Sequence, residues 1–145
     1  MSSNLVEIEN QLPGVASWGI GKGLEGSRTL QALIHPNCIK VNEKINIYCA
    51  TVRDTDLLKI EIFRLGWYSN SGSRPIMTLN DIESNNQISW HKKTNIIGVF
   101  SKQKEEYRDS IVDKWEKSAE IIVDKSWTPG IYHARISNND GLRYI

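Results

Sequence analysis

The sequence predicts an all-β fold in which short antiparallel strands pack on a single core. Turn-forming residues recur beyond residue 28, about every 8–15 residues, as in β-sandwiches and barrels. The segments between these turns alternate apolar and polar side chains, which is typical of sheets that bury one face. At 145 residues, the chain is long enough for one domain with a core of its own.

Residues 1–28 lack this alternation. They contain Pro13 and the glycine-rich stretch Gly14–Gly23. Because glycine and proline disfavour a regular helix, we expect an irregular N-terminal arm that lies on the domain. The β-domain itself is then expected to cover residues 29–145.

The alternation is clearest in a set of segments for which we predict strands: Lys44–Val52, Leu57–Leu65, Ser118–Asp124 and Ile131–Ser137. Their apolar faces should form the core, with Ile47, Ile60, Ile62, Ile121, Tyr132, Ala134 and Ile136 buried. Tyr132 follows the Pro129-Gly130 turn at the head of its strand. We therefore also expect its hydroxyl to hydrogen-bond back to the upstream loop.

Residues 101–116 allow two interpretations. Tyr107, Ile111 and Trp115 recur at helical spacing, which favours an amphipathic helix capped by Ser101. The alternative is a loop of mixed charges that runs into a strand near Ile111.

The C-terminal residues predict a short last strand. A turn at Asn138–Gly141 should begin a hairpin, but only Leu142–Ile145 follow it. Strands usually have about five or six residues, so we expect the last strand to be truncated. The edge of Ile131–Ser137 would then be open to self-association or to a partner strand.

Composition and charge argue against several classes of protein. Lys+Arg is 18 and Asp+Glu is 17, and a net charge of +1 argues against a nucleic-acid-binding surface. No apolar stretch has the length of a signal peptide or a membrane span. We therefore expect a cytoplasmic protein without membrane contact. In that compartment, Cys38 and Cys49, which flank one predicted turn, should form a buried thiol pair rather than a disulfide.

No motif for catalysis or cofactor binding is evident. The chain has three histidines, His35, His91 and His133, which lie far apart in the sequence. A zinc site needs three or four converging ligands, so no metal is expected. The sequence has no nucleophile elbow, and its glycine-rich stretch lacks the spacing of a dinucleotide site. We therefore predict no catalytic residue and no cofactor.

One loop has the composition of a binding site. Arg64, Trp67 and Tyr68 end a predicted strand, and a Ser/Gly loop leads from them to Arg74. An arginine stacked on an aromatic ring can still offer two donors to a carboxylate. These four residues could therefore bind an anionic or sugar-like ligand on one exposed face. The alternative is that both arginines tie the loop to its own carbonyls or to acidic neighbours.

Short motifs follow one another along nearly the whole chain: Glu7–Asn10, Pro13-Gly14, Leu24–Gly26, Phe63–Tyr68, Gly72–Arg74, Trp115 with Ser118, and Trp127–Ile136. In this order they resemble the N-terminal β-sandwich region of proteins similar to the large (beta) subunit of N,N-dimethylformamidase. The resemblance implies an immunoglobulin-like sandwich of about seven strands. It also implies a lead-in and strand over Trp115–Val123, and therefore no helix that reaches Trp115.

The resemblance has limited implications for function. In that family, the metal-dependent amide-hydrolysing centre belongs to the larger part of the chain that follows this region. No catalytic residue of the family can therefore be transferred to a position here. We expect a non-catalytic accessory domain that packs against a catalytic amidohydrolase-like partner. The alternative is a small ligand- or carbohydrate-binding module that uses the Arg64–Arg74 loop.

Overall fold

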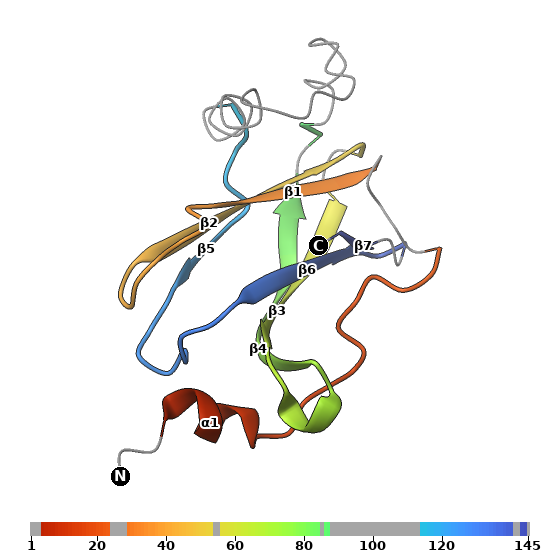
Figure 1. Cartoon of the computed structure of the whole chain (residues 1–145). Coiled ribbons are helices and arrows are strands. Elements are labelled where there is room, and N and C mark those ends of the chain that lie inside the picture. The colour runs from red at the N-terminus through yellow and green to blue at the C-terminus, as the bar shows by residue number, and fades with distance from the viewer. Residues whose placement is uncertain are drawn as a thin grey trace, which may run out of the picture.

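The computed structural model describes residues 4–23, 29–53, 56–84, 86–87, 114–140 and 143–144. Within these ranges the chain forms two antiparallel sheets with little helix. The first sheet has the order β1-β2-β5, formed by Leu30–His35, Lys44–Thr51 and Ala119–Ile122. The second has the order β4-β3-β6-β7, formed by Ser73–Ser84, Asp56–Leu65, Tyr132–Asn138 and Arg143–Tyr144 (Figure 1). The expected all-β class is confirmed.

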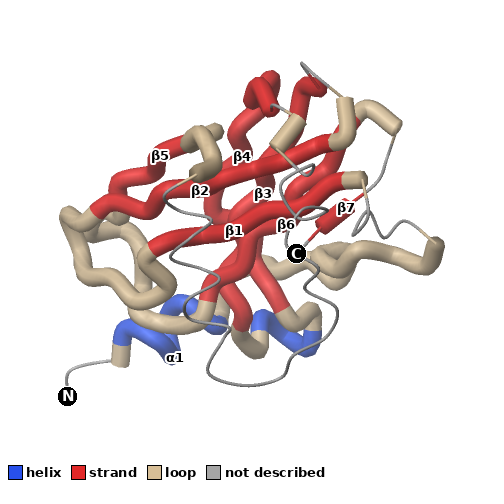
Figure 2. Tube along the Cα trace, turned by 90° about the horizontal axis from the view of Figure 1, so that it is seen from above, coloured by secondary structure: helices blue, strands red, loops and turns tan. Residues whose placement is uncertain are grey.

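The two sheets lie over one another and share one core (Figure 2). The first sheet contributes Leu30, Ile47, Cys49 and Ile121, and the second contributes Leu58, Ile60, Ile62, Ala134 and Ile136. The core prediction is confirmed for all its members but one. Tyr132 is half-buried and packs at the margin of the core.

The predicted strands are found as β2, β3, β5 and β6, whereas β1 and β4 were not predicted. β4 is the outermost strand of its sheet. It contains Pro75, which an edge strand tolerates because its amide side faces away from the ladder. Asp81 has a positive φ of 54°, and the β3–β4 register shifts twice. Such bulges interrupt a strict alternation and explain why β4 shows no clear period of two.

The N-terminal arm contains a short helix, which corrects the expectation of a wholly irregular arm. Helix α1 spans Leu5–Asn10, and the Asn4 side chain accepts a hydrogen bond from the Val6 amide at 3.1 Å. An N-cap of this kind favours a helix start even in a short segment. The glycine-rich part after Pro13 has no regular structure until Gly23, as expected. It runs along the second sheet, where Val15 forms a bridge with Ser73.

Two further expectations concern partly described segments. Most of residues 101–116 lie outside the described residues, but Lys114 and Trp115 form a turn and no helix reaches Trp115. Strand β7 pairs with Ile136 and Ser137 of β6. Leu142 and Ile145 lie outside the described residues.

The cysteines correct the expectation of a buried thiol pair. Both are free thiols, and Cys49 is buried whereas Cys38 is exposed. In the β1–β2 ladder, Cys49 lies opposite Ala32. Cys38 belongs to the connection that follows β1 and therefore lies beyond the ladder.

Candidate functional site

A buried charged cluster lies at the end of β3. Arg64 is only 2% exposed, although it carries a charge. Its guanidinium donates hydrogen bonds to the carbonyl oxygens of Pro129 (2.9 Å) and Thr128 (3.3 Å) and to the Tyr68 hydroxyl (2.9 Å). Burial of a charge is costly unless such partners satisfy it. Arg64 therefore fastens the connection before β6 to the end of β3.

Glu9 of α1 completes this cluster from the N-terminal arm. Its carboxylate accepts hydrogen bonds from Arg74 Nε (2.6 Å), the Tyr68 hydroxyl (2.8 Å) and Thr128 Oγ1 (3.2 Å). Burial would raise the pKa of Glu9, but these hydrogen bonds and the Arg74 charge outweigh it and lower the pKa. Tyr68 thus links Arg64 to Glu9, and burial raises the pKa of its hydroxyl.

The turn that carries Tyr68 is strained. The short helix η1 spans Tyr68–Asn70, and φ is 43° at Tyr68, 53° at Ser69 and 71° at Asn70. Non-glycine residues rarely adopt left-handed backbone, least of all a bulky side chain. The fully buried ring of Tyr68 and its hydrogen bonds hold this turn in place. The side chain of the neighbouring Trp67 is 65% exposed.

The four residues of the predicted binding site are therefore close together but do not share an exposed face. Arg64 and Tyr68 are buried, and Arg74 is ion-paired with Glu9. The donors of Arg64 are used by its own chain, as the alternative interpretation of the sequence had it. Only Trp67 is largely exposed.

Sequence reasoning missed Glu9 and Thr128 as members of this cluster. The inward position of Arg64 could have been predicted from the sequence, because Arg64 continues the alternating series Ile60 and Ile62 of β3. The burial of Glu9 could not have been predicted in this way. It lies in a segment without strand periodicity, 65 residues before its partner Arg74.

A second charged cluster holds the N-terminal arm against the outer face of the second sheet. Arg135 is ion-paired with Glu61 (2.9 Å) and donates to the carbonyl oxygens of Ser17 (2.5 Å) and Gly19 (3.1 Å). Next to it, the His133 ring packs between Trp18 and Phe63, with ring centroids 5.2 and 5.4 Å apart. Burial is the main reason why the pKa of His133 is lowered. The arm is therefore held both at Glu9 and at Ser17 and Gly19.

Further exposed apolar side chains lie on the segments that are hydrogen-bonded to the Trp67 region. Ile131 is 70% exposed, and its carbonyl accepts a hydrogen bond from the Leu65 amide. The Trp67 amide donates to Asn10 of α1 at 3.1 Å. Exposed positions on α1 and just beyond it recur as a stripe: Leu5, Ile8 and Leu12. We call these five side chains the apolar end.

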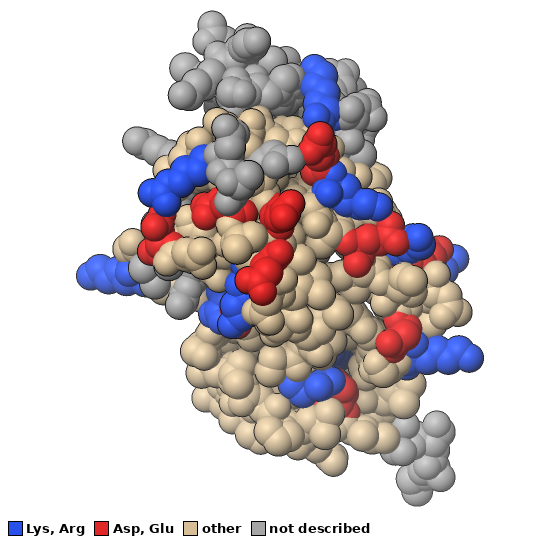
Figure 3. All heavy atoms as spheres, turned by 180° about the vertical axis from the view of Figure 1, so that it is seen from behind, with Lys and Arg blue, Asp and Glu red and all other residues tan. Residues whose placement is uncertain are grey.

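Charged side chains are unevenly distributed over the face that Figure 3 shows. In Figure 3 they gather over the middle and top of the visible face. The lower end of that face, where α1 and η1 lie in Figure 1, shows few of them. An exposed patch of this kind is typical of an interaction site.

The described part of the chain holds no group of three or more His, Cys, Asp or Glu that could bind a metal ion. In the same ranges, none of the helical segments has the length and hydropathy needed to cross a membrane. Comparisons with protein-family models, curated proteins and solved structures found no match.

Proposed function

We propose that this chain is a non-catalytic accessory domain that docks onto a catalytic partner through the apolar end. The observation that carries this proposal is the exposure of Trp67 and Ile131 beside the apolar stripe of α1. Large aromatic and aliphatic side chains of this kind are common anchors in protein interfaces. The buried Arg64–Tyr68–Glu9 cluster fixes the segments that carry them, so little conformational freedom is lost on binding.

We also propose that the two sheets form an immunoglobulin-like sandwich. The orders β1-β2-β5 and β4-β3-β6-β7 support this, because they match the sheets of three and four strands in such folds. The Tyr132 hydroxyl donates to the Thr128 carbonyl at 2.5 Å. This bond to the upstream loop is the one expected of a corner tyrosine, a feature of that fold, and it supports the proposal.

The chemistry of the partner follows from the sequence resemblance. The motifs resemble the front region of N,N-dimethylformamidase-like proteins, so the proposed partner is a catalytic amidohydrolase-like chain. The geometry favours this over a ligand-binding module at the Arg64–Arg74 loop. A ligand there would have to displace the carbonyl oxygens and the carboxylate that the two arginines already bind.

Binding can be measured by calorimetry with the catalytic region of an N,N-dimethylformamidase-like amidohydrolase. Trp67→Ser and Ile131→Ser should each weaken binding by about tenfold or more, as substitutions of interface anchors do. Ile122→Ser is the matched control, because Ile122 is exposed but lies on β5, outside the apolar end. Unchanged binding in Trp67→Ser and Ile131→Ser, or no binding by the wild type, would refute the proposal.

A further inference from the structure

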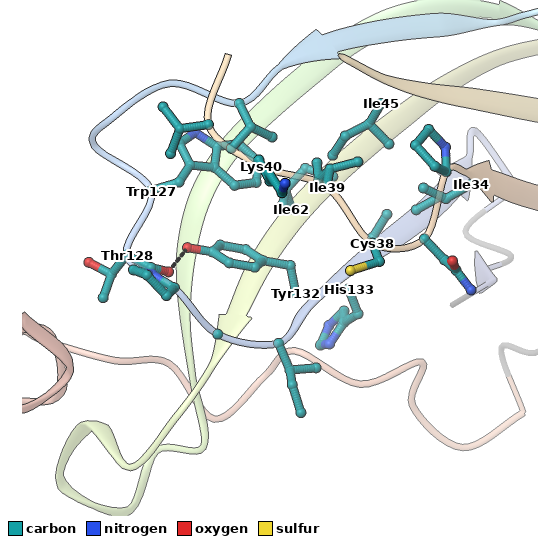
Figure 4. A pocket seen from close by; sticks show the side chains of 18 residues that line it. Ile34, Cys38, Ile39, Lys40, Ile45, Ile62, Trp127, Thr128, Tyr132 and His133 are labelled. Carbon is teal, nitrogen blue, oxygen red and sulfur yellow. Dashed lines mark hydrogen bonds between the residues drawn. The ribbon is translucent and has the colours of Figure 1, made fainter. Parts of the chain in front are cut away.

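A cavity of about 560 Å³ lies at one end of the space between the two sheets. The connection after β1 (residues 36–41) and the connection before β6 (residues 127–131) form its two sides. Figure 4 shows Trp127 and Tyr132 on one side and Cys38 and Ile39 on the other. Inward-facing core side chains of both sheets also line it, namely Ile34, Ile45, Ile62 and Ala134. The volume is within the range of about 300–1,000 Å³ found for small-molecule sites.

The walls of this cavity offer apolar surface and few free polar groups. The rings of Trp127 and Tyr132 pack with centroids 4.9 Å apart. The Tyr132 hydroxyl is already bound to the Thr128 carbonyl, as the dashed line in Figure 4 shows. The ring of His133 packs against Trp18 and Phe63. A ligand would therefore gain mainly from burying apolar surface.

The charge at the cavity has one sign. Among the lining residues, Lys40 is the only Lys, Arg, Asp or Glu. It is exposed and therefore lies at the mouth. Its ammonium group takes part in no ion pair among the described residues. The nearby Glu43 carboxylate instead accepts from the Lys40 backbone amide, at 2.7 Å.

We propose that this cavity binds an amphipathic carboxylate. Its aliphatic body fills the space between the sheets, and its carboxylate lies at the mouth against Lys40. An apolar cavity with a single cation at its mouth complements a molecule with a long apolar part and one negative end. This proposal goes beyond the docking function. Ile131 belongs to both surfaces, but the test of the cavity uses other variants and needs no partner chain.

Cys38 provides a reporter for occupancy of the cavity. It is an exposed free thiol that lines the cavity, whereas Cys49 is buried in the core. Burial raises the pKa of Cys49 to about 12, so alkylation of the folded protein takes place at Cys38. Decanoate, below its micelle-forming concentration, should slow the reaction of Cys38 with iodoacetamide. Decanol and decyltrimethylammonium should protect it less.

Two variants make the test specific. Lys40→Gln should raise the Kd for decanoate, measured by calorimetry, by about fivefold, the effect of losing one exposed charge pair. Lys125→Gln is the control, because Lys125 is an exposed cation outside the lining, and it should leave the Kd unchanged. Ile39→Trp, which fills the cavity from its loop side, should abolish the protection of Cys38 by decanoate.

Three results would overturn the proposal. The first is unchanged Cys38 alkylation in the presence of decanoate. The second is equal protection of Cys38 by decyltrimethylammonium, which would show that the cavity does not select a negatively charged ligand. The third is a Kd that neither Lys40→Gln nor Ile39→Trp alters.

Discussion

Glu9 shows how one residue can link a short helix to distant parts of the chain. It is a buried carboxylate whose partners come from η1, β4 and the connection before β6. An unpaired carboxylate at this position would be strongly destabilising. The cluster therefore couples the position of α1 to the charge of Glu9.

Replacement of Glu9 should change how stability depends on pH. The folded-state pKa of Glu9 is below its usual value of 4.5. Its charge therefore stabilises the fold above about pH 4.5, and this contribution is lost as the pH falls through the lowered pKa. Glu9→Gln should cost about 1–3 kcal/mol in the free energy of unfolding near neutral pH, and less in acid.

Urea denaturation between about pH 3 and about pH 7 measures this difference. Glu7→Gln is the control, because Glu7 lies on the exposed side of the same helix. If the free energy of unfolding of Glu9→Gln depended on pH in the same way as that of the wild type over the whole range, this would contradict the role assigned to Glu9. Glu61, whose pKa is also lowered, titrates in both proteins and cancels in the comparison.

At the scale of elements, the connection before β6 depends on close contact between backbone and guanidinium. A Cβ atom at Gly130 would lie 2.9 Å from both Nε and Nη2 of Arg64. The guanidinium is already bound to Thr128 and Pro129 on this connection. The guanidinium therefore has little room to move aside, and only a glycine at position 130 leaves space for it.

Gly130→Ala should destabilise the fold by about 1–3 kcal/mol, because Arg64 loses hydrogen bonds while it remains buried. Gly19→Ala is the matched control, since a Cβ there meets nothing within 4 Å. We expect a change of less than about 0.5 kcal/mol for the control. Equal stabilities of the two variants in urea denaturation would show that the contact with Arg64 is not tight.

Elements with a regular pattern could be predicted from the sequence, and those set by distant contacts could not. The sequences of β2, β3, β5 and β6 alternate apolar and polar side chains over much of their length, because one face of each lies on the core. β4 is interrupted by bulges and by Pro75. α1 has only six residues, too few for a helical pattern to stand out in the sequence, and it is held by Glu9, whose partners are remote in sequence. The sequence also placed Arg64, Trp67, Tyr68 and Arg74 in one loop region. The alternation of β3 indicated the inward position of Arg64, whereas no pattern indicated the burial of Tyr68.

On the scale of the whole molecule, the surfaces where another chain could bind depend on the N-terminal arm and on the edges of the sheets. The arm covers the outer face of the second sheet at Phe63, His133 and Arg135. The apolar end and the edge of β6 are separate from this covered face. We propose the β6 edge as a place where a second copy or a partner strand pairs.

Hydrogen exchange can test the β6 edge residue by residue. The Leu65 amide donates to the Ile131 carbonyl, and the antiparallel register continues through Arg64–Tyr132 and Phe63–His133. Backbone groups in such a pair point alternately toward and away from the neighbouring strand. The amides of His133 and Arg135 therefore point toward β3, and those of Tyr132 and Ala134 point toward the β7 side.

Among the described residues, β7 pairs only with Ile136 and Ser137. In a dilute solution of the protein, the Tyr132 and Ala134 amides should therefore exchange faster than those of His133 and Arg135. If copies pair at this edge, protection of Tyr132 and Ala134 should rise with protein concentration, while that of His133 and Arg135 stays constant. Uniform protection of all four amides at low concentration would show that the edge is already covered in the monomer, and pairing there would then be ruled out.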